Sequence, residues 1–123
     1  MIQFYIAGQK RAFVLFDGIQ SGPVNWFDKA RVKSSSWSDL GVNATTNFFS
    51  IAGDPNFTRR FYANQLYNDC PNDIGWFVVS SGTYCAWEDT STNMAILYSN
   101  QSTAQLWQSA SASRADVFAV YVR

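Results

Sequence analysis

The sequence contains no histidine, and residues 61–113 contain neither lysine nor arginine. Without an imidazole the chain cannot form a Ser-His-Asp triad, a Cys-His pair or a histidine-ligated metal site. Its two cysteines are too few for a zinc site made of thiolates alone. No glycine-rich loop continues into the lysine and hydroxyl residue of a phosphate-binding loop. These absences exclude most nucleophilic, zinc-dependent and nucleotide-dependent chemistry.

Charge balance and the lengths of the apolar runs exclude two further classes of protein. Nine basic and nine acidic side chains cancel, so the chain lacks the basic character of a nucleic-acid-binding protein. No run approaches the roughly 18 apolar residues of a membrane-spanning helix. We therefore expect no nucleic-acid partner and no membrane span. The first residues also lack the basic segment and cleavage site of a signal peptide.

Aromatic residues are abundant where charged ones are scarce. Phe, Trp and Tyr make up 17% of the 123 residues, and charged residues only 15%. This balance is typical of a chain that buries a large core and not of a disordered one. A chain of this length can bury roughly two thirds of its unfolded surface around one core. We therefore predict a single domain spanning residues 1–123.

Short apolar runs separated by turn residues predict an all-β fold. Residues 2–7 and 11–17 flank Gly8-Gln9-Lys10, which indicates a hairpin. A single helical turn is expected at 26–31, and the apolar run 117–122 predicts a central strand. Further strands are expected at 47–52, 58–63, 76–80, 84–87 and 95–99, with a short segment at 106–107. This spacing favours an antiparallel β-sandwich of jelly-roll type.

Acidic side chains gather around the two cysteines, Cys70 and Cys85. If the two thiols join, their Cα atoms lie about 5–6 Å apart, and carboxylates from two loops share one small region. Like charges placed together need a cation, and this stretch of sequence supplies none. Calcium prefers carboxylate, amide and carbonyl oxygens. We therefore predict a Ca²⁺ site at these four carboxylates: Asp69, Asp73, Glu88 and Asp89.

The same stretch has groups that suit a sugar. Two sugar hydroxyls can complete a calcium shell, while an aromatic face takes the apolar side of the ring, and Trp87 is adjacent to Glu88. We therefore predict sugar binding at Asn72, Trp87 and Asn93. The alternative interpretation is that the acidic and amide residues form turns or are solvated, and that Trp87 packs in the core.

Other large side chains are assigned structural roles. Side chains alternate along a strand, so only one of Arg59 and Arg60 can face solvent, and we expect the inward one to pair with an aspartate. Trp76 opens a predicted strand and is expected in the core. The remaining tryptophans are assigned to packing or to a subunit interface: Trp26, Trp37 and Trp107.

Specific short motifs extend over nearly the whole chain. They include Phe16-Asp17-Gly18, Ser34 to Leu40, Arg59-Arg60-Phe61, Cys70 to Phe77, Cys85-Ala86-Trp87-Glu88, Leu97-Tyr98-Ser99 and Ala115-Asp116-Val117. Together they resemble an extracellular module of cnidarian and other marine-invertebrate proteins. The pattern is similar to secreted lectin-like proteins of sea anemones, whose galactose recognition uses calcium. The resemblance implies site roles for Asp73, Trp87 and Glu88, and members of this family carry a longer segment before the position where this chain begins.

The residues and the resemblance together predict a secreted, calcium-dependent lectin that binds galactose-type glycans. A homodimer is expected, because shallow sites gain strength through multivalency. Glycosylation sequons at Asn43, Asn56 and Asn100 favour secretion. Two alternatives remain open: an adhesion or matrix module with a structural calcium ion, and a glycosidase that uses Glu88 with an aspartate. We favour a protein without enzyme activity.

Overall fold

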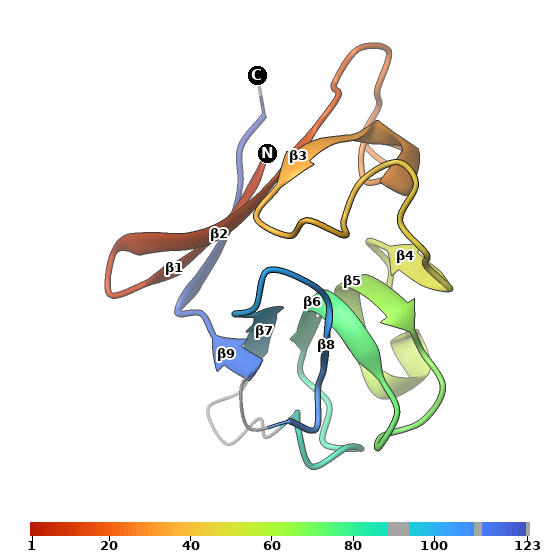
Figure 1. Cartoon of the computed structure of the whole chain (residues 1–123), viewed down its shortest axis with the longest axis vertical. Helices are drawn as coiled ribbons and strands as arrows, with labels where there is room; N and C mark the ends of the chain where they lie inside the picture. Colours follow the sequence, from red (N-terminus) through yellow and green to blue (C-terminus); the bar gives the residue numbers. More distant parts are fainter. Residues whose placement is uncertain (89–93, 110–111, 123) are drawn as a thin grey trace.

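Two antiparallel sheets pack against each other in the computed structural model of the chain, which describes residues 1–88, 94–109 and 112–122. The first sheet has the strand order β10-β1-β2-β3 and contains β1 (Ile2–Ile6), β2 (Gln9–Phe16), β3 (Val32–Ser35) and β10 (Val117–Val120). Figure 1 shows this sheet in the upper half of the molecule, close to both ends of the chain. The predicted all-β sandwich is confirmed.

The second sheet has the strand order β4-β5-β6-β7-β9, and β8 pairs with β6 beside this path. Its strands are β4 (Phe48–Ser50), β5 (Arg59–Leu66), β6 (Ile74–Ser80), β7 (Ala95–Ser99), β8 (Gln105–Leu106) and β9 (Ala112–Arg114). Two single 3-10 turns connect strands: η1 (Lys29–Arg31) and η2 (Pro55–Phe57). The first of them lies within the segment for which one helical turn was predicted.

The predicted hairpin at the start of the chain forms with a two-residue turn. Ile6 pairs with Gln9, so Ala7 and Gly8 occupy the turn, with φ angles of 51° and 75°. Two residues with positive φ match the right-handed twist of the flanking strands, and Gly8 adopts this conformation without steric cost. The hairpin therefore fixes the register of the sheet that forms one wall of the pocket described below.

An aromatic core fills the space between the two sheets. Phe4 of β1 lies within 6.1 Å, measured between ring centroids, of rings on the facing elements, including Phe77 of β6 and Tyr98 of β7. Such aromatic pairs add about 0.5–1.5 kcal/mol each beyond the area they bury. Trp37 and Trp76 are also buried here, which confirms the core position predicted for Trp76 and packing for Trp37.

A second core covers the opposite face of the second sheet. Side chains alternate along β7, so Tyr98 points into the first core and Leu97 into the second. Trp107 is fully buried in this second core, and Trp87 packs against it. The loops that carry the two cysteines therefore lie over this face of the second sheet and not between the sheets.

One predicted strand is absent, and another forms at a different place in its sheet from the one expected. The run at 117–122 was expected to be a central strand, but β10 is an edge strand that pairs only with β1 within the described chain. Phe118 packs inward on Phe4 and Phe61, while Val117 and Val120 are exposed, a distinction that apolar periodicity cannot make. Residues 84–87 form bends and turns instead of a strand.

Candidate functional site

The disulfide joins the two loops that the sequence predicts to meet. Cys70, after β5, is bonded to Cys85, after β6, and their Cα atoms are 5.4 Å apart. Asp73 and Glu88 are both brought to the same buried region beneath this bridge. The sequence therefore predicts the convergence of these two carboxylates correctly.

The cation in this region is Arg59, which opens β5 and whose side chain is buried. Its Nε donates to Glu88 Oε1 at 2.8 Å, and its Nη1 lies 3.8 Å from Asp73 Oδ2. Its Nη2 donates to Cys85 Sγ at 3.1 Å. The inward arginine of the 59–60 pair is thus structural, as expected, although its nearest partner is a glutamate and not an aspartate.

Both oxygens of Glu88 are engaged by protein groups. Oε1 accepts from Arg59 and from the Ser80 hydroxyl at 2.7 Å, and Oε2 accepts from the Cys85 N–H at 2.7 Å. Burial alone would raise the pKa of Glu88, but the hydrogen bonds from Arg59, Cys85 and Ser80 outweigh burial and hold the pKa below its usual value. Glu88 is therefore a buried carboxylate kept ionised by its partners.

Asp73 also faces Arg59, but fewer hydrogen bonds offset the cost of burying its charge than for Glu88. Its Oδ1 accepts from the Asn68 N–H at 2.9 Å, whereas Oδ2 has no hydrogen-bond partner among the described residues. Burial raises the pKa of Asp73 above its ordinary value, and the Asn68 N–H and Arg59 offset this only in part. The two carboxylates that flank Arg59 therefore respond to the site in opposite directions.

Trp87 contacts the same arginine through its ring. The guanidinium carbon of Arg59 lies 4.7 Å from the Trp87 ring centroid, a cation–π distance. The centroids of the Trp87 and Trp107 rings are 6.0 Å apart. These contacts give the half-buried Trp87 ring a packing role in the second core.

The other predicted ligands do not join this buried group. Asp69 and Asn72 are exposed and hydrogen-bond to each other, while Asp89 and Asn93 lie outside the described residues. In the described parts of the chain, no three His, Cys, Asp or Glu side chains form a group that could hold a metal ion. Asp73 and Glu88 do not fit a calcium shell, because Arg59 already supplies their positive charge.

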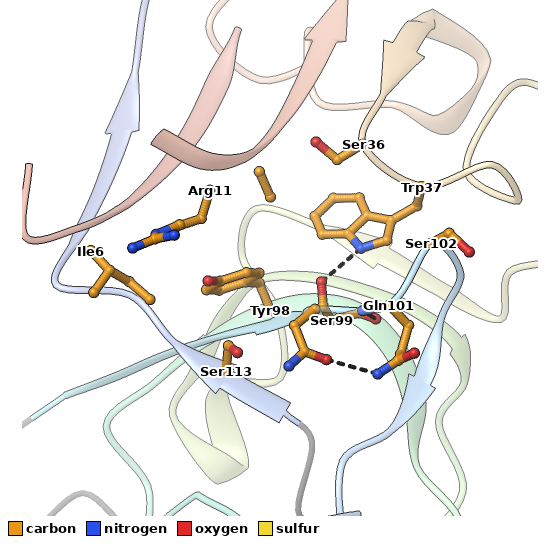
Figure 2. A pocket seen from close by; sticks show the side chains of 11 residues that line it. Ile6, Arg11, Ser36, Trp37, Tyr98, Ser99, Gln101, Ser102 and Ser113 are labelled. Atoms are coloured by element: carbon orange, nitrogen blue, oxygen red, sulfur yellow. Dashed lines mark hydrogen bonds between the residues drawn. The ribbon is translucent and has the colours of Figure 1, made fainter. Parts of the chain in front are cut away.

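A pocket of about 520 Å³ opens where the two sheets meet, away from the disulfide. Figure 2 shows its side chains, which come from β1 and β2 of the first sheet, β7 and β9 of the second, and two connecting segments. The lining residues are Ile6, Arg11, Ala12, Ser36, Trp37, Tyr98, Ser99, Asn100, Gln101, Ser102 and Ser113.

Hydroxyl and amide groups dominate the polar lining of this pocket. Its base is aromatic: the Trp37 side chain is held there by an Nε1 hydrogen bond of 2.9 Å to the Ser99 carbonyl. Gln101 Nε2 donates to Asn100 Oδ1 at 3.0 Å, so two amide side chains of the lining are held together. Hydroxyls and amides both donate and accept hydrogen bonds, so these groups suit a hydroxyl-rich molecule.

Sequence reasoning missed this pocket. Its residues come from four separate parts of the chain, and no spacing in the sequence shows that the first sheet meets β7 and β9 here. The available signal was weak: the polar run 99–103 follows a buried strand, and a serine precedes Trp37. Polar residues of this kind are also typical of ordinary loops.

A second pocket, of about 710 Å³, lies beside β10 and the loop after β2. Its lining is largely apolar and includes Leu15, Trp26 and Val120. The one carboxylate among its described lining residues, Asp17, is already paired with Lys33 at 3.3 Å. It therefore offers a sugar fewer hydrogen-bonding side chains than the pocket at Trp37.

The chain is a disulfide-bridged β-sandwich with a polar pocket where its two sheets meet. Comparison with known proteins finds no matching protein-family model, no matching curated protein and no matching solved structure. In the described parts of the chain, no helix has the length and apolar character needed to cross a membrane.

Proposed function

We propose that the protein binds carbohydrate and that the pocket at Trp37 and Tyr98 is its sugar site. The observation that carries this proposal is the lining: hydroxyls and amides surround an aromatic base in a volume of about 520 Å³. Ligand pockets in proteins typically have volumes of about 300–1,000 Å³ and a few polar groups that fix orientation. The resemblance of the sequence motifs to lectin-like proteins supports the same class.

Binding is favoured over glycoside hydrolysis. The one glutamate of the chain, Glu88, is fully buried, and its oxygens are engaged by Arg59, Ser80 and Cys85. A carboxylic acid in glycoside cleavage must reach the glycosidic oxygen, and one held ionised by an arginine is a poor proton donor. The proposal therefore contains no catalytic step.

The finer parts of the sequence-based hypothesis remain predictions: galactose preference, calcium assistance, secretion and a homodimer. The disulfide fits secretion, because such bonds persist in oxidising compartments. Calcium assistance has less support, since Arg59 neutralises Asp73 and Glu88. We therefore propose sugar binding that does not depend on calcium at those two carboxylates.

A glycan array tests the proposal, with the protein in calcium and again in chelator. We expect binding in both conditions. Ser102→Trp places a large ring at the rim of the pocket and should abolish binding, whereas Ser34→Trp, an exposed position on β3 outside the pocket, should not.

Each other outcome identifies a different error. An array without signal would rule out carbohydrate binding and favour the adhesion-module alternative. Full binding by Ser102→Trp would place the sugar elsewhere. Binding that disappears in chelator would favour the site predicted from the sequence, with Asp89 as a calcium ligand and Asn93 as a sugar contact.

A further inference from the structure

Arg11 is the sole charged side chain among the described residues that line the pocket. It lies on β2, and its exposed guanidinium makes no ion pair or hydrogen bond with any described residue. Arg59 and Arg60, by contrast, both donate to protein acceptors. The pocket therefore contains one uncompensated positive charge and no carboxylate in its described lining.

Tyr98 adds a second unsatisfied donor next to this charge. Its side chain is only 4% exposed, yet its hydroxyl hydrogen-bonds to no other described residue. Figure 2 shows this hydroxyl and the Arg11 guanidinium on the same side of the pocket. Most polar groups on a buried side chain have a partner, so this hydroxyl is available to an acceptor that is not part of the described chain.

Ser113 of β9 supplies a third donor on that side. It is paired directly with Tyr98 across the two strands, and both residues line the pocket. Its hydroxyl also has no partner among the described residues. The pocket lining thus holds one guanidinium, the hydroxyls of Tyr98 and Ser113, and the amides of Asn100 and Gln101. Figure 2 shows Arg11 and Gln101 on opposite sides of the pocket, with Tyr98 between them. One end of the pocket suits an anion and the other suits neutral hydroxyls.

We propose that the ligand is an acidic saccharide, whose carboxylate or sulfate group binds at Arg11, Tyr98 and Ser113 while its ring hydroxyls bind at Asn100 and Gln101. Arginine recognises planar carboxylates through two parallel hydrogen bonds, and charge-assisted bonds are roughly twice as strong as neutral ones. This inference rests on the proposed sugar site, and it adds the charge of the sugar.

Calorimetric titration with a matched pair of probes tests this inference: methyl galactoside, and methyl galacturonide, which differs by one carboxylate. We expect the wild-type protein to bind the galacturonide about tenfold more tightly. Arg11→Gln should remove this preference, because it should weaken galacturonide binding much more than galactoside binding. The matched control is Lys10→Gln, which removes the neighbouring charge on β2, where the ammonium lies over the Phe13 ring outside the pocket; it should keep the preference.

The outcomes separate this inference from the proposed function. Equal binding of the two probes, or an equal loss of both in Arg11→Gln, overturns the anion site while the sugar site stands. Binding of neither probe nor of any glycan on the array overturns both. As a third probe, inorganic sulfate should compete with the galacturonide and not with the galactoside; failure to compete also contradicts the anion site.

Discussion

Two arginines of this protein have opposite surroundings. Arg59 is buried, with Glu88 at 2.8 Å, Asp73 at 3.8 Å and the Trp87 ring beside it. Arg11 is exposed at a pocket whose described lining holds no carboxylate. Both are on strands, β5 and β2, and both lie near aromatic side chains. They differ in whether the protein itself neutralises the charge.

The difference separates a structural cation from one that can serve a ligand. A buried charge is tolerated only when partners satisfy it, so Arg59 and its carboxylates must form together with the second core. An exposed arginine needs no partner for the fold, so its hydrogen-bonding capacity remains for a ligand. Removing Arg59 should therefore change stability, and removing Arg11 should change binding.

The largest expected effect is that of Arg59→Met. Loss of the guanidinium leaves Glu88 buried and unpaired, and breaking a buried pair from one side costs about 3–5 kcal/mol. Urea unfolding followed by tryptophan fluorescence measures the free energy of unfolding. The matched control is Arg60→Met, because the exposed Arg60 side chain makes one hydrogen bond to a described residue, at 3.0 Å to the Ala52 carbonyl. Its cost in free energy of unfolding should be much smaller.

A double variant sharpens this test. Arg59→Met combined with Glu88→Gln removes both charges, so it should be more stable than Arg59→Met alone. Equal costs for Arg59→Met and Arg60→Met would mean that Arg59 is not the cation on which this region depends.

The next expected effect is on the acid sensitivity of the protein. The pKa of Glu88 is lowered in the folded state, so its contribution to stability is present above the unfolded value of 4.5 and is lost as the pH falls through the folded value. The pKa of Asp73 is raised above 3.8, so its contribution is present below that value and is lost as the pH rises through the folded pKa.

Urea unfolding from about pH 2.5 to pH 6 should therefore give opposite slopes for the two carboxylates. The stability advantage of wild type over Glu88→Gln should grow with rising pH and then level off. The advantage of wild type over Asp73→Asn should be greatest at low pH and should shrink as the pH rises. Slopes of the same sign would show that Arg59 does not favour Glu88 over Asp73.

Much of the fold could be predicted because its signals are local. The residues at 53–56, Gly-Asp-Pro-Asn, are typical of a turn. In the structure Gly53 has a φ of 64° and no room for a Cβ, which would lie 1.8 Å from the Arg59 carbonyl oxygen. Strand β4 ends before this turn, and strand β5 begins after it. The short strands β8 and β9 gave little signal, because two or three residues carry no reliable period.

The candidate sites could be predicted only in part, because they depend on residues that are distant in the sequence. The sequence placed Asp73 and Glu88 together correctly, because only two cysteines were available to bridge. Calcium was predicted as their counter-ion because residues 61–113 contain no lysine or arginine. In the structure the counter-ion is Arg59, which lies just before that range and 29 residues from Glu88 in the sequence. The pocket could not be predicted, since it depends on the packing of two sheets.

The smallest expected effect comes from Tyr98→Phe, which removes one oxygen from the pocket and keeps the ring that packs on Phe4. Because the hydroxyl has no partner among the described residues, the free energy of unfolding should change by less than about 0.5 kcal/mol. Affinity for methyl galacturonide should fall by roughly threefold to tenfold, the value of one hydrogen bond, and affinity for methyl galactoside should fall less. Tyr62→Phe is the matched control, since that hydroxyl accepts from Asn64 Nδ2 at 2.9 Å in the second core. It should lower stability without altering the preference between the two probes. If Tyr98→Phe lowered stability as much as Tyr62→Phe did, the Tyr98 hydroxyl would have a structural partner, and the distinction between the paired interior and the unpaired pocket would fail at this residue.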